Sequence, residues 1–299
     1  MVLSTLLAEA ACARPNPAQP IHCCQAELID ESRLLKPNLP GSDAYAMWLV
    51  LEHQAQRSFD LERLLLPGVP RKAVKWTVDG SPLTFAALAY GRAPELDHVS
   101  IRTVRVARKD GSGSDAFRVI ITPPATRELF QRWLEKERAD LEWLNLLPPV
   151  YASLMPGFAD PEPAHCPHDY WGPVHKLNSH LHPGGAYEMR SRAVGDGFGH
   201  QAVYDAQGNL IRTGLGAASA DRATPRLLGL GFLKHRDSDV RPFVWAAQLD
   251  GNPVNPLWLF RDLDAALVYL GPHLQDYMGV RPALVGSHGE VPAGSCIGP

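Results

Sequence analysis

The chain has 299 residues, of which 45% are hydrophobic and 20% are charged, and its formal net charge is −3. This composition is that of a globular protein, and the length allows one large domain or two domains of ordinary size. The weak overall charge implies no broad basic surface, so a stable complex with nucleic acid is not expected, although local charge can differ from the total and leaves a nuclease open.

The first 40 residues predict an extended arm. Prolines at positions 15, 17, 20, 37 and 40 remove backbone donors and interrupt regular structure. The apolar start, Met1–Ala13, contains Glu9 and lacks the basic region of a secretory signal peptide. No apolar run reaches the roughly 18 residues of a membrane-spanning helix, and the five cysteines are too unevenly spaced for a disulfide framework. We therefore expect the protein in the cytoplasm of the producing cell, from which a dedicated machine would export it.

Residues 41–150 predict an N-terminal α+β domain. Asp43–Leu66 has the apolar pattern of a helix that ends at Pro67. Val99–Ala107 and Phe117–Ile121 alternate apolar and polar residues on either side of a glycine-containing turn, which is typical of a β-hairpin.

A second helix of this domain is expected to begin at Thr122, a capping residue that is followed by two prolines. Its apolar stripe runs to Leu144, and Pro148 ends it. Residues 151–173 contain five further prolines and predict a linker.

Residues 174–299 predict a second α+β domain. The expected elements are a strand, the two arms of a hairpin and two helices: Ala186–Arg192, His200–Asp205, Asn209–Thr213, Asp239–Leu249 and Arg261–Leu270. Gly208 suits the positive-φ position of the hairpin turn. The expected fold class is α+β, with two domains of antiparallel hairpins and packed helices joined by a proline-rich linker.

Histidine and cysteine are concentrated around the end of the predicted linker. The candidate metal ligands are His165, Cys166, His168, His180 and His182. Imidazole and thiolate are donors that zinc prefers, and a structural zinc site needs four of them. Because their spacing matches no standard zinc motif, the alternative of a solvent-facing linker whose histidines never meet stays open.

A second polar group could carry acid–base catalysis. Its members are Arg190, His200, Asp205, His235 and Asp239. A histidine beside a carboxylate can act as a general base or acid, and an arginine can stabilise an anion. The alternative is structural, because Asp205 can hold the hairpin turn and Asp239 can cap the helix that follows it.

Residues 184–250 contain three short motifs. They are Gly199-His200-Gln201-Ala202-x-Tyr204-Asp205-x-x-Gly208-x-Leu210-Ile211, Gly216-x-x-Ser219-Ala220-Asp221 and His235-x-x-x-Asp239-Val240-x-Pro242-Phe243. Together they resemble a pattern in bacterial polymorphic toxins, in the C-terminal regions of Rhs-type proteins and in cargo effectors of type VI secretion. The resemblance implies delivery into a rival cell, contact with components of a secretion apparatus and a cognate immunity protein.

We therefore expect a secreted antibacterial effector of a contact-dependent or type VI system, with a hydrolytic His/Asp site in its C-terminal domain. One alternative is a non-enzymatic secretion adaptor or binding protein, in which the same polar residues only hold loops. Another is a zinc protein that is organised by the histidines between residues 165 and 182. The residues indicate neither the substrate nor the compartment in which it would be attacked.

Overall fold

The computed structural model describes residues 47–55, 57–65, 69–83, 87–90, 98–154, 171–172, 174–177, 181–225, 230–252, 254, 267, 269–284 and 290–291. The predicted arm, residues 1–40, and most of the predicted linker, residues 151–173, lie outside them. Contacts divide the chain into unit 1, Met1–Glu95 with Ser100–Pro124, and unit 2, Leu96–Val99 with Ala125–Pro299. The sequence predicts an N-terminal domain over residues 41–150 that ends with a helix. In the structure this helix, Thr126–Arg138, belongs to unit 2, so the boundary between the units falls before it.

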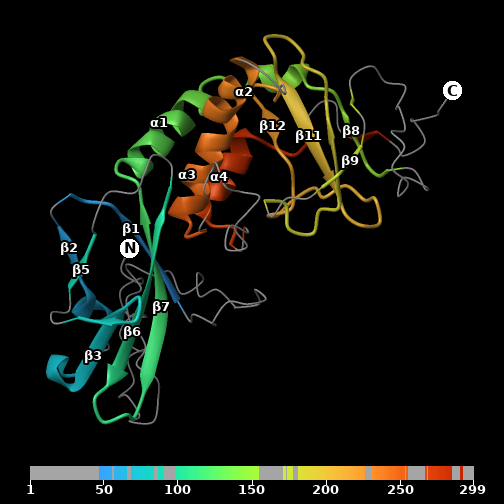
Figure 1. Ribbon diagram of the computed structural model, residues 1–299. Coiled ribbons are helices and arrows are strands. Elements are labelled where there is room, and N and C mark those ends of the chain that lie inside the picture. Colours follow the sequence, from blue (N-terminus) through green and yellow to red (C-terminus); the bar gives the residue numbers. More distant parts are fainter. Residues whose placement is uncertain are drawn as a thin grey trace, which may run out of the picture. The chain divides into compact units, whose positions relative to one another are not determined.

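Unit 1 is built on a five-stranded sheet (Figure 1). In spatial order its strands are β1 (Met47–Glu52), β7 (Ser114–Thr122), β6 (Ser100–Arg108), β3 (Val74–Val78) and β4 (Ser81–Pro82). The antiparallel pairing of β6 with β7 confirms the predicted hairpin. In contrast, β1 runs parallel to β7, with Leu49 opposite Val119.

The predicted helix over Asp43–Leu66 is wrong. The described part of this range contains β1, the strand β2 (Ser58–Asp60) and the short 3₁₀ helix η2 (Leu61–Leu64). Leu49 and Leu51 are two residues apart and both buried, as in a strand that turns one face to a core. Residues 47–52 form a strand because they pair with β7, which is distant in the chain. The local apolar pattern does not indicate this pairing.

The core of unit 1 lies on one face of this sheet. There β2 pairs with β5 (Ala87–Ala89), and these strands bring Phe59 and Leu88 against the sheet. Trp76 of β3 meets Phe117 of β7 edge to face, with 6.5 Å between the ring centroids. The 3₁₀ helix η3 (Arg71–Ala73) leads into β3.

Unit 2 contains a four-stranded antiparallel sheet. In spatial order its strands are β12 (Ala220–Asp221), β11 (Gly199–Tyr204), β10 (Tyr187–Arg190) and β9 (His175–Lys176). A separate parallel pair joins β8 (Val150–Tyr151) to β13 (Glu290–Val291). The strand predicted over Ala186–Arg192 is confirmed. The turn after β11 is confirmed as well, with Gly208 at a φ of +80°, and the chain returns as a single bridge between Tyr204 and Leu210.

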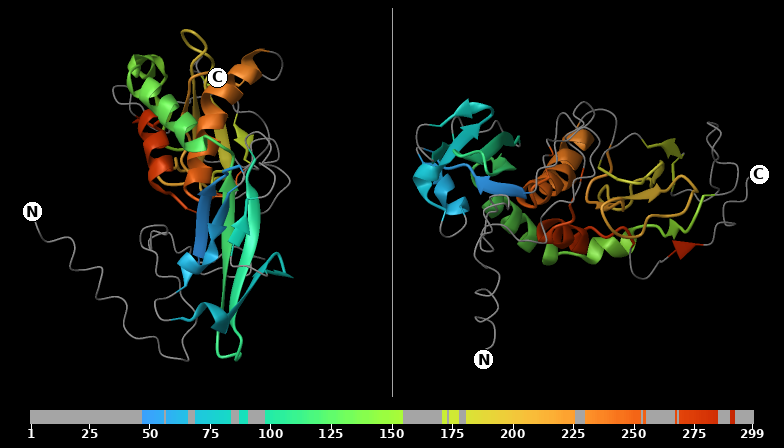
Figure 2. Two further views of the ribbon diagram at one scale, coloured as in Figure 1. Left: turned by 90° about the vertical axis from the view of Figure 1, so that its left-hand side faces the viewer. Right: turned by 90° about the horizontal axis from the view of Figure 1, so that it is seen from below.

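Helices form the other layer of unit 2. They are α1 (Thr126–Arg138), the 3₁₀ helix η4 (Glu142–Leu146), α2 (Leu230–His235), the π-helical turn η5 (Arg236–Val240), α3 (Arg241–Leu249) and α4 (Pro272–Val280). Figures 1 and 2 show α1 beside α3 and α4. Their shared core includes Phe130 of α1, Val244 of α3 and Leu274 of α4. Among the described helices, none has the length and apolar character to span a membrane.

Two helix boundaries differ from the sequence prediction. α1 begins at Thr126, because Thr122, the expected cap, is the last residue of β7 and pairs with Glu52. Pro272, which follows the helix expected over Arg261–Leu270, is the first residue of α4. A proline costs little there, because the first N–H of a helix has no partner in any case; the expected helix itself lies mainly outside the described residues. The fold class is α+β, as predicted.

Candidate functional site

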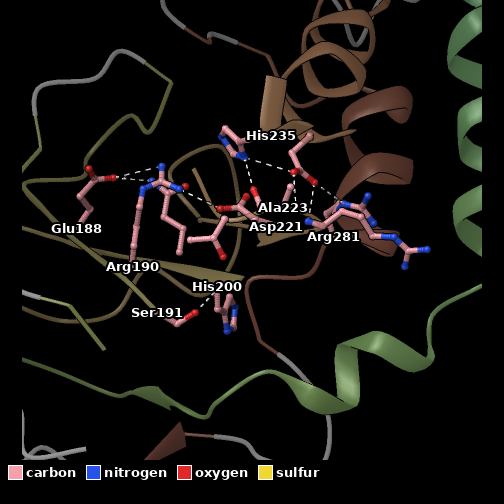
Figure 3. Close-up of polar contacts among 12 residues, drawn as sticks. Glu188, Arg190, Ser191, His200, Asp221, Ala223, His235 and Arg281 are labelled. Atoms are coloured by element: carbon pink, nitrogen blue, oxygen red, sulfur yellow. Dashed lines mark hydrogen bonds and ion pairs between the residues drawn. The ribbon is translucent and has the colours of Figure 1, made fainter. Parts of the chain in front are cut away.

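Three acidic or imidazole side chains converge in unit 2. Asp221 of β12, His235 at the end of α2 and Asp239 in η5 each offer a ligand atom within 4.8 Å of the others. Asp239 is 2% exposed and Asp221 3% exposed, whereas His235 is partly exposed. Figure 3 shows Arg190 and Arg281 on opposite sides of Asp221 and His235. We call Asp221, His235 and Asp239 the acid–base cluster.

The backbone between α2 and α3 sets the positions of His235 and Asp239. Pro242, in the first turn of α3, has no N–H to donate to the preceding turn, and its ring would crowd that turn's carbonyl. The intervening residues form the π-helical turn η5, a local widening that often occurs at functional sites. Residues four apart on such a helical segment face the same side, so His235 Nδ1 lies 3.3 Å from Asp239 Oδ2.

His235 is held in a defined tautomer. Its Nδ1–H donates a hydrogen bond to the carbonyl oxygen of Ala223 at 2.8 Å, and because a carbonyl can only accept, Nδ1 carries the proton. In the neutral ring the lone pair is therefore on Nε2, the atom that a general base uses. Burial lowers the pKa of His235, but its hydrogen bond with Asp239 and the charges of Asp221 and Asp239 outweigh burial, so that this pKa is raised above 6.5.

Asp239 anchors the chain beyond β12. Its Oδ1 accepts the backbone N–H of Arg222 at 2.7 Å, and its Oδ2 accepts that of Ala223 at 3.0 Å. The Nε of Arg281 lies 3.3 Å from the same Oδ1. Asp239 is thus not the cap of the helix that follows it, which was the structural alternative for this residue; it ties η5 to the end of the sheet.

Asp221 is not among the catalytic residues predicted from the sequence, although it ends the second motif of the toxin-like pattern. Its Oδ2 accepts a hydrogen bond from Arg190 Nη1 at 2.9 Å. Burial raises the pKa of Asp221 to about 6, with a smaller contribution from the charge of Asp239 and against the opposing charge of Arg190. Asp221 can therefore hold a proton near neutral pH, which is what a general acid requires.

Arg190 is a partly exposed residue beside the cluster, with a side-chain exposure of 32%. Its guanidinium also lies 3.8 Å from Glu188 Oε2, and that oxygen accepts a hydrogen bond from Gln201 Nε2 at 2.6 Å. Arg190 is thus shared between Glu188 and Asp221. These two carboxylates compensate its charge, so Arg190 holds them in place; that it also stabilises an anion stays a prediction.

Arg281 closes the cluster from the buried side. It follows α4, has no solvent exposure and donates from Nη1 to Glu137 Oε2 of α1 at 2.5 Å. Its guanidinium also lies over the rings of Trp133 and Trp143, with 5.3 Å and 5.0 Å to the ring centroids. Burial alone would lower the pKa of Arg281, but its hydrogen bond with Glu137 and the charge of Asp239 outweigh burial, so that this pKa is raised. No local motif identifies this residue, because its partner Glu137 is 144 positions away.

Two predicted catalytic residues are not part of the cluster. His200 is 1% exposed, its Nε2–H donates to the carbonyl of Ala283 at 3.0 Å, and burial lowers its pKa to about 4. Asp205 holds the hairpin turn, since its Oδ1 accepts the backbone N–H groups of Gln207 and Asn209 at 2.9 and 2.8 Å. Both residues have the structural role that was the alternative to catalysis.

The predicted zinc ligands do not form a described site. His165, Cys166, His168 and His180 lie outside the described residues. His182 Nδ1–H donates to the carbonyl of Ala217 at 3.1 Å, and burial lowers the pKa of this histidine. Within the part of the chain that the structure describes, the group that could hold a metal ion is instead the acid–base cluster.

Comparison of the chain with protein-family models, curated proteins and solved structures gives no match. The function must therefore be argued from the site itself.

Proposed function

We propose that the chain is an antibacterial effector with a hydrolytic acid–base site at Asp221, His235 and Asp239. The observation that carries this proposal is that an imidazole and two carboxylates from three separate segments meet within 4.8 Å. His235 Nε2 would accept the proton of water or of a substrate hydroxyl, and Asp221 would supply a proton to the leaving group. Asp239 would orient the imidazole and stabilise its cation.

Charge around the cluster favours a substrate without negative charge. The carboxyl groups of Asp221 and Asp239 within the cluster lie near those of Glu137 and Glu188, and two guanidiniums, those of Arg190 and Arg281, compensate their charge in part. A phosphodiester would bring a further negative charge to this group and would be repelled. Glycosidic or amide bonds are the better candidates, since a carboxyl group with a raised pKa, as that of Asp221, is the general acid that glycoside hydrolysis uses.

The biological setting of the proposal comes from the toxin-like motifs. They favour export by a contact-dependent or type VI apparatus, action in a neighbouring cell and neutralisation by an immunity protein in the producer. Hydrolysis of a cell-wall glycan or peptide would act in the periplasm of the target cell. This setting is consistent with the charge of the site.

A metal-dependent site is the second candidate, because the same three residues offer a His-Asp-Asp donor set that suits zinc. Against it, both oxygens of Asp239 already accept backbone N–H groups, and Asp221 is bound to Arg190. Metal analysis of purified protein separates the candidates. About one equivalent of zinc that is lost in Asp221→Asn would favour the metal site, since structural and catalytic zinc is held tightly.

The proposal is tested by expression in a sensitive bacterium, with the protein directed either to the cytoplasm or to the periplasm. We expect a growth defect in the periplasm that His235→Ala and Asp221→Asn abolish. His273→Ala is the matched control, because the His273 side chain is as exposed as that of His235, 12% in each case, and bonds a buried aspartate, Asp250.

The outcomes of this test are distinct. Unchanged growth in both compartments would refute an antibacterial function. A growth defect that persists in His235→Ala and Asp221→Asn, when both variants melt as the wild type does, would favour a non-enzymatic adaptor or binding protein. A defect that is lost equally in His273→Ala would point to general destabilisation of unit 2.

A further inference from the structure

Unit 1 contains a groove along β3 that is separate from the acid–base cluster. Its volume is about 470 Å³, within the range of pockets that hold small molecules. Residues of η2, η3, β3 and β4 line it. β4 pairs with Thr77 and Val78 on one edge of β3, whereas β6 pairs with all five residues of β3 on its other edge.

The groove carries a local excess of positive charge. Arg71, Lys72, Lys75 and Lys109 line it together with one carboxylate, that of Glu62. Glu62 Oε2 is already paired with Arg71 Nε at 2.5 Å. Three lysine charges therefore remain at the groove. Positive charge is thus concentrated here, although the formal net charge of the whole chain is −3.

The acidic residues of the adjoining turns do not compensate these lysines. Asp110 accepts hydrogen bonds from the backbone N–H and the hydroxyl of Ser112, at 2.9 and 2.6 Å, so its carboxylate is directed into its own turn. Asp79 accepts from Arg102 and from the backbone N–H of Thr103, at 3.0 and 2.9 Å. Among the described ion pairs of unit 1, none includes the three lysines of the groove.

We propose that the groove binds a small molecule that carries phosphate groups. Lys72, Lys75 and Lys109 would surround the phosphate, since ammonium groups act as point charges for phosphate oxygens. Pro82 and Leu83, at the same groove, would contact the organic part of the ligand. A multiply charged anion would relieve the mutual repulsion of the lysines more than a single carboxylate would. This site would serve recognition, and it does not depend on the hydrolytic function proposed for unit 2.

Isothermal titration calorimetry of the full-length protein tests the proposal, with inorganic pyrophosphate and ATP as probes. Vesicles of phosphatidylcholine, with and without phosphatidylglycerol, test whether the phosphate belongs to a lipid headgroup. We expect pyrophosphate or ATP to bind, and the affinity to fall at least about tenfold in Lys72→Ala/Lys75→Ala/Lys109→Ala, because charge-assisted hydrogen bonds are lost. Binding to anionic vesicles that pyrophosphate displaces would assign the same groove to a lipid phosphate.

Lys136→Ala/Lys176→Ala is the matched control, since both lysines are exposed and lie in unit 2. The groove variant should melt at the wild-type temperature, because its three lysines are exposed. The proposal is overturned if none of the probes binds at millimolar concentration. It is overturned equally if the groove and control variants bind them with the affinity of the wild type.

Discussion

Replacing Arg281 by methionine should destabilise unit 2 more than any change of an exposed charge. Arg281 has no solvent exposure, bonds Glu137 at 2.5 Å and lies 3.3 Å from Asp239. Both carboxylates are nearly inaccessible, with side-chain exposures of 5% and 2%. Removal of one partner of a buried ion pair costs about 3–5 kcal/mol, because the other charge stays buried without compensation. Such a loss is a large part of the roughly 5–15 kcal/mol by which a domain is usually stable.

Urea unfolding followed by far-UV circular dichroism and tryptophan fluorescence measures this effect, since Trp133 and Trp143 lie against the guanidinium. Arg138→Met is the control: Arg138 pairs with Asp276 at 2.7 Å, but the two side chains are 55% and 41% exposed. Its loss should cost at most about 1 kcal/mol. Glu137→Gln combined with Arg281→Met should recover part of the stability. If Arg281→Met alone unfolds within about 1 kcal/mol of the wild type, the buried network has been misjudged.

Two further predictions concern residues outside the cluster. Because the pKa of His200 is lowered to about 4 from 6.5, the folded state prefers its neutral form; its contribution to stability is complete above about pH 6.5 and is lost as the pH falls toward 4. The loss of stability amounts to about 3 kcal/mol. Urea unfolding at several pH values should show a smaller loss on acidification in His200→Gln than in the wild type. Equal dependence of stability on pH in the two proteins would refute the prediction. Gly271→Ala should lower the melting temperature, because the added Cβ would lie 2.6 Å or less from the carboxylate atoms of Asp250. Gly279→Ala is the control and should melt as the wild type does, because a Cβ there would have no atom within 4 Å. Equal melting temperatures of the two variants would contradict the close approach of Gly271 to Asp250.

The candidate site could be predicted only in part. The four-residue spacing of His235 and Asp239 before an apolar helix predicts that they meet, and the structure brings them together. The sequence around Asp221 does not indicate a site, because nothing in it shows that Arg190 would meet this residue from another strand. The sequence does not distinguish His200 from His235, which both lie in polar motifs. Burial and the partners of each ring separate them: His200 donates to a backbone carbonyl, and His235 meets two aspartates.

Local chemistry by itself determined the two hairpins of this protein. The alternation that forms β6 and β7 lies within a short stretch of chain, and Asp205 and Gly208 suffice to specify the turn after β11. Tertiary structure alone decided that residues 47–52 form a parallel strand, that α1 belongs to unit 2, and that Arg281 pairs with Glu137. The physical reason is the same in each case. These outcomes depend on contacts with residues that are distant in the chain, and a short stretch of sequence does not specify which distant residues it will contact.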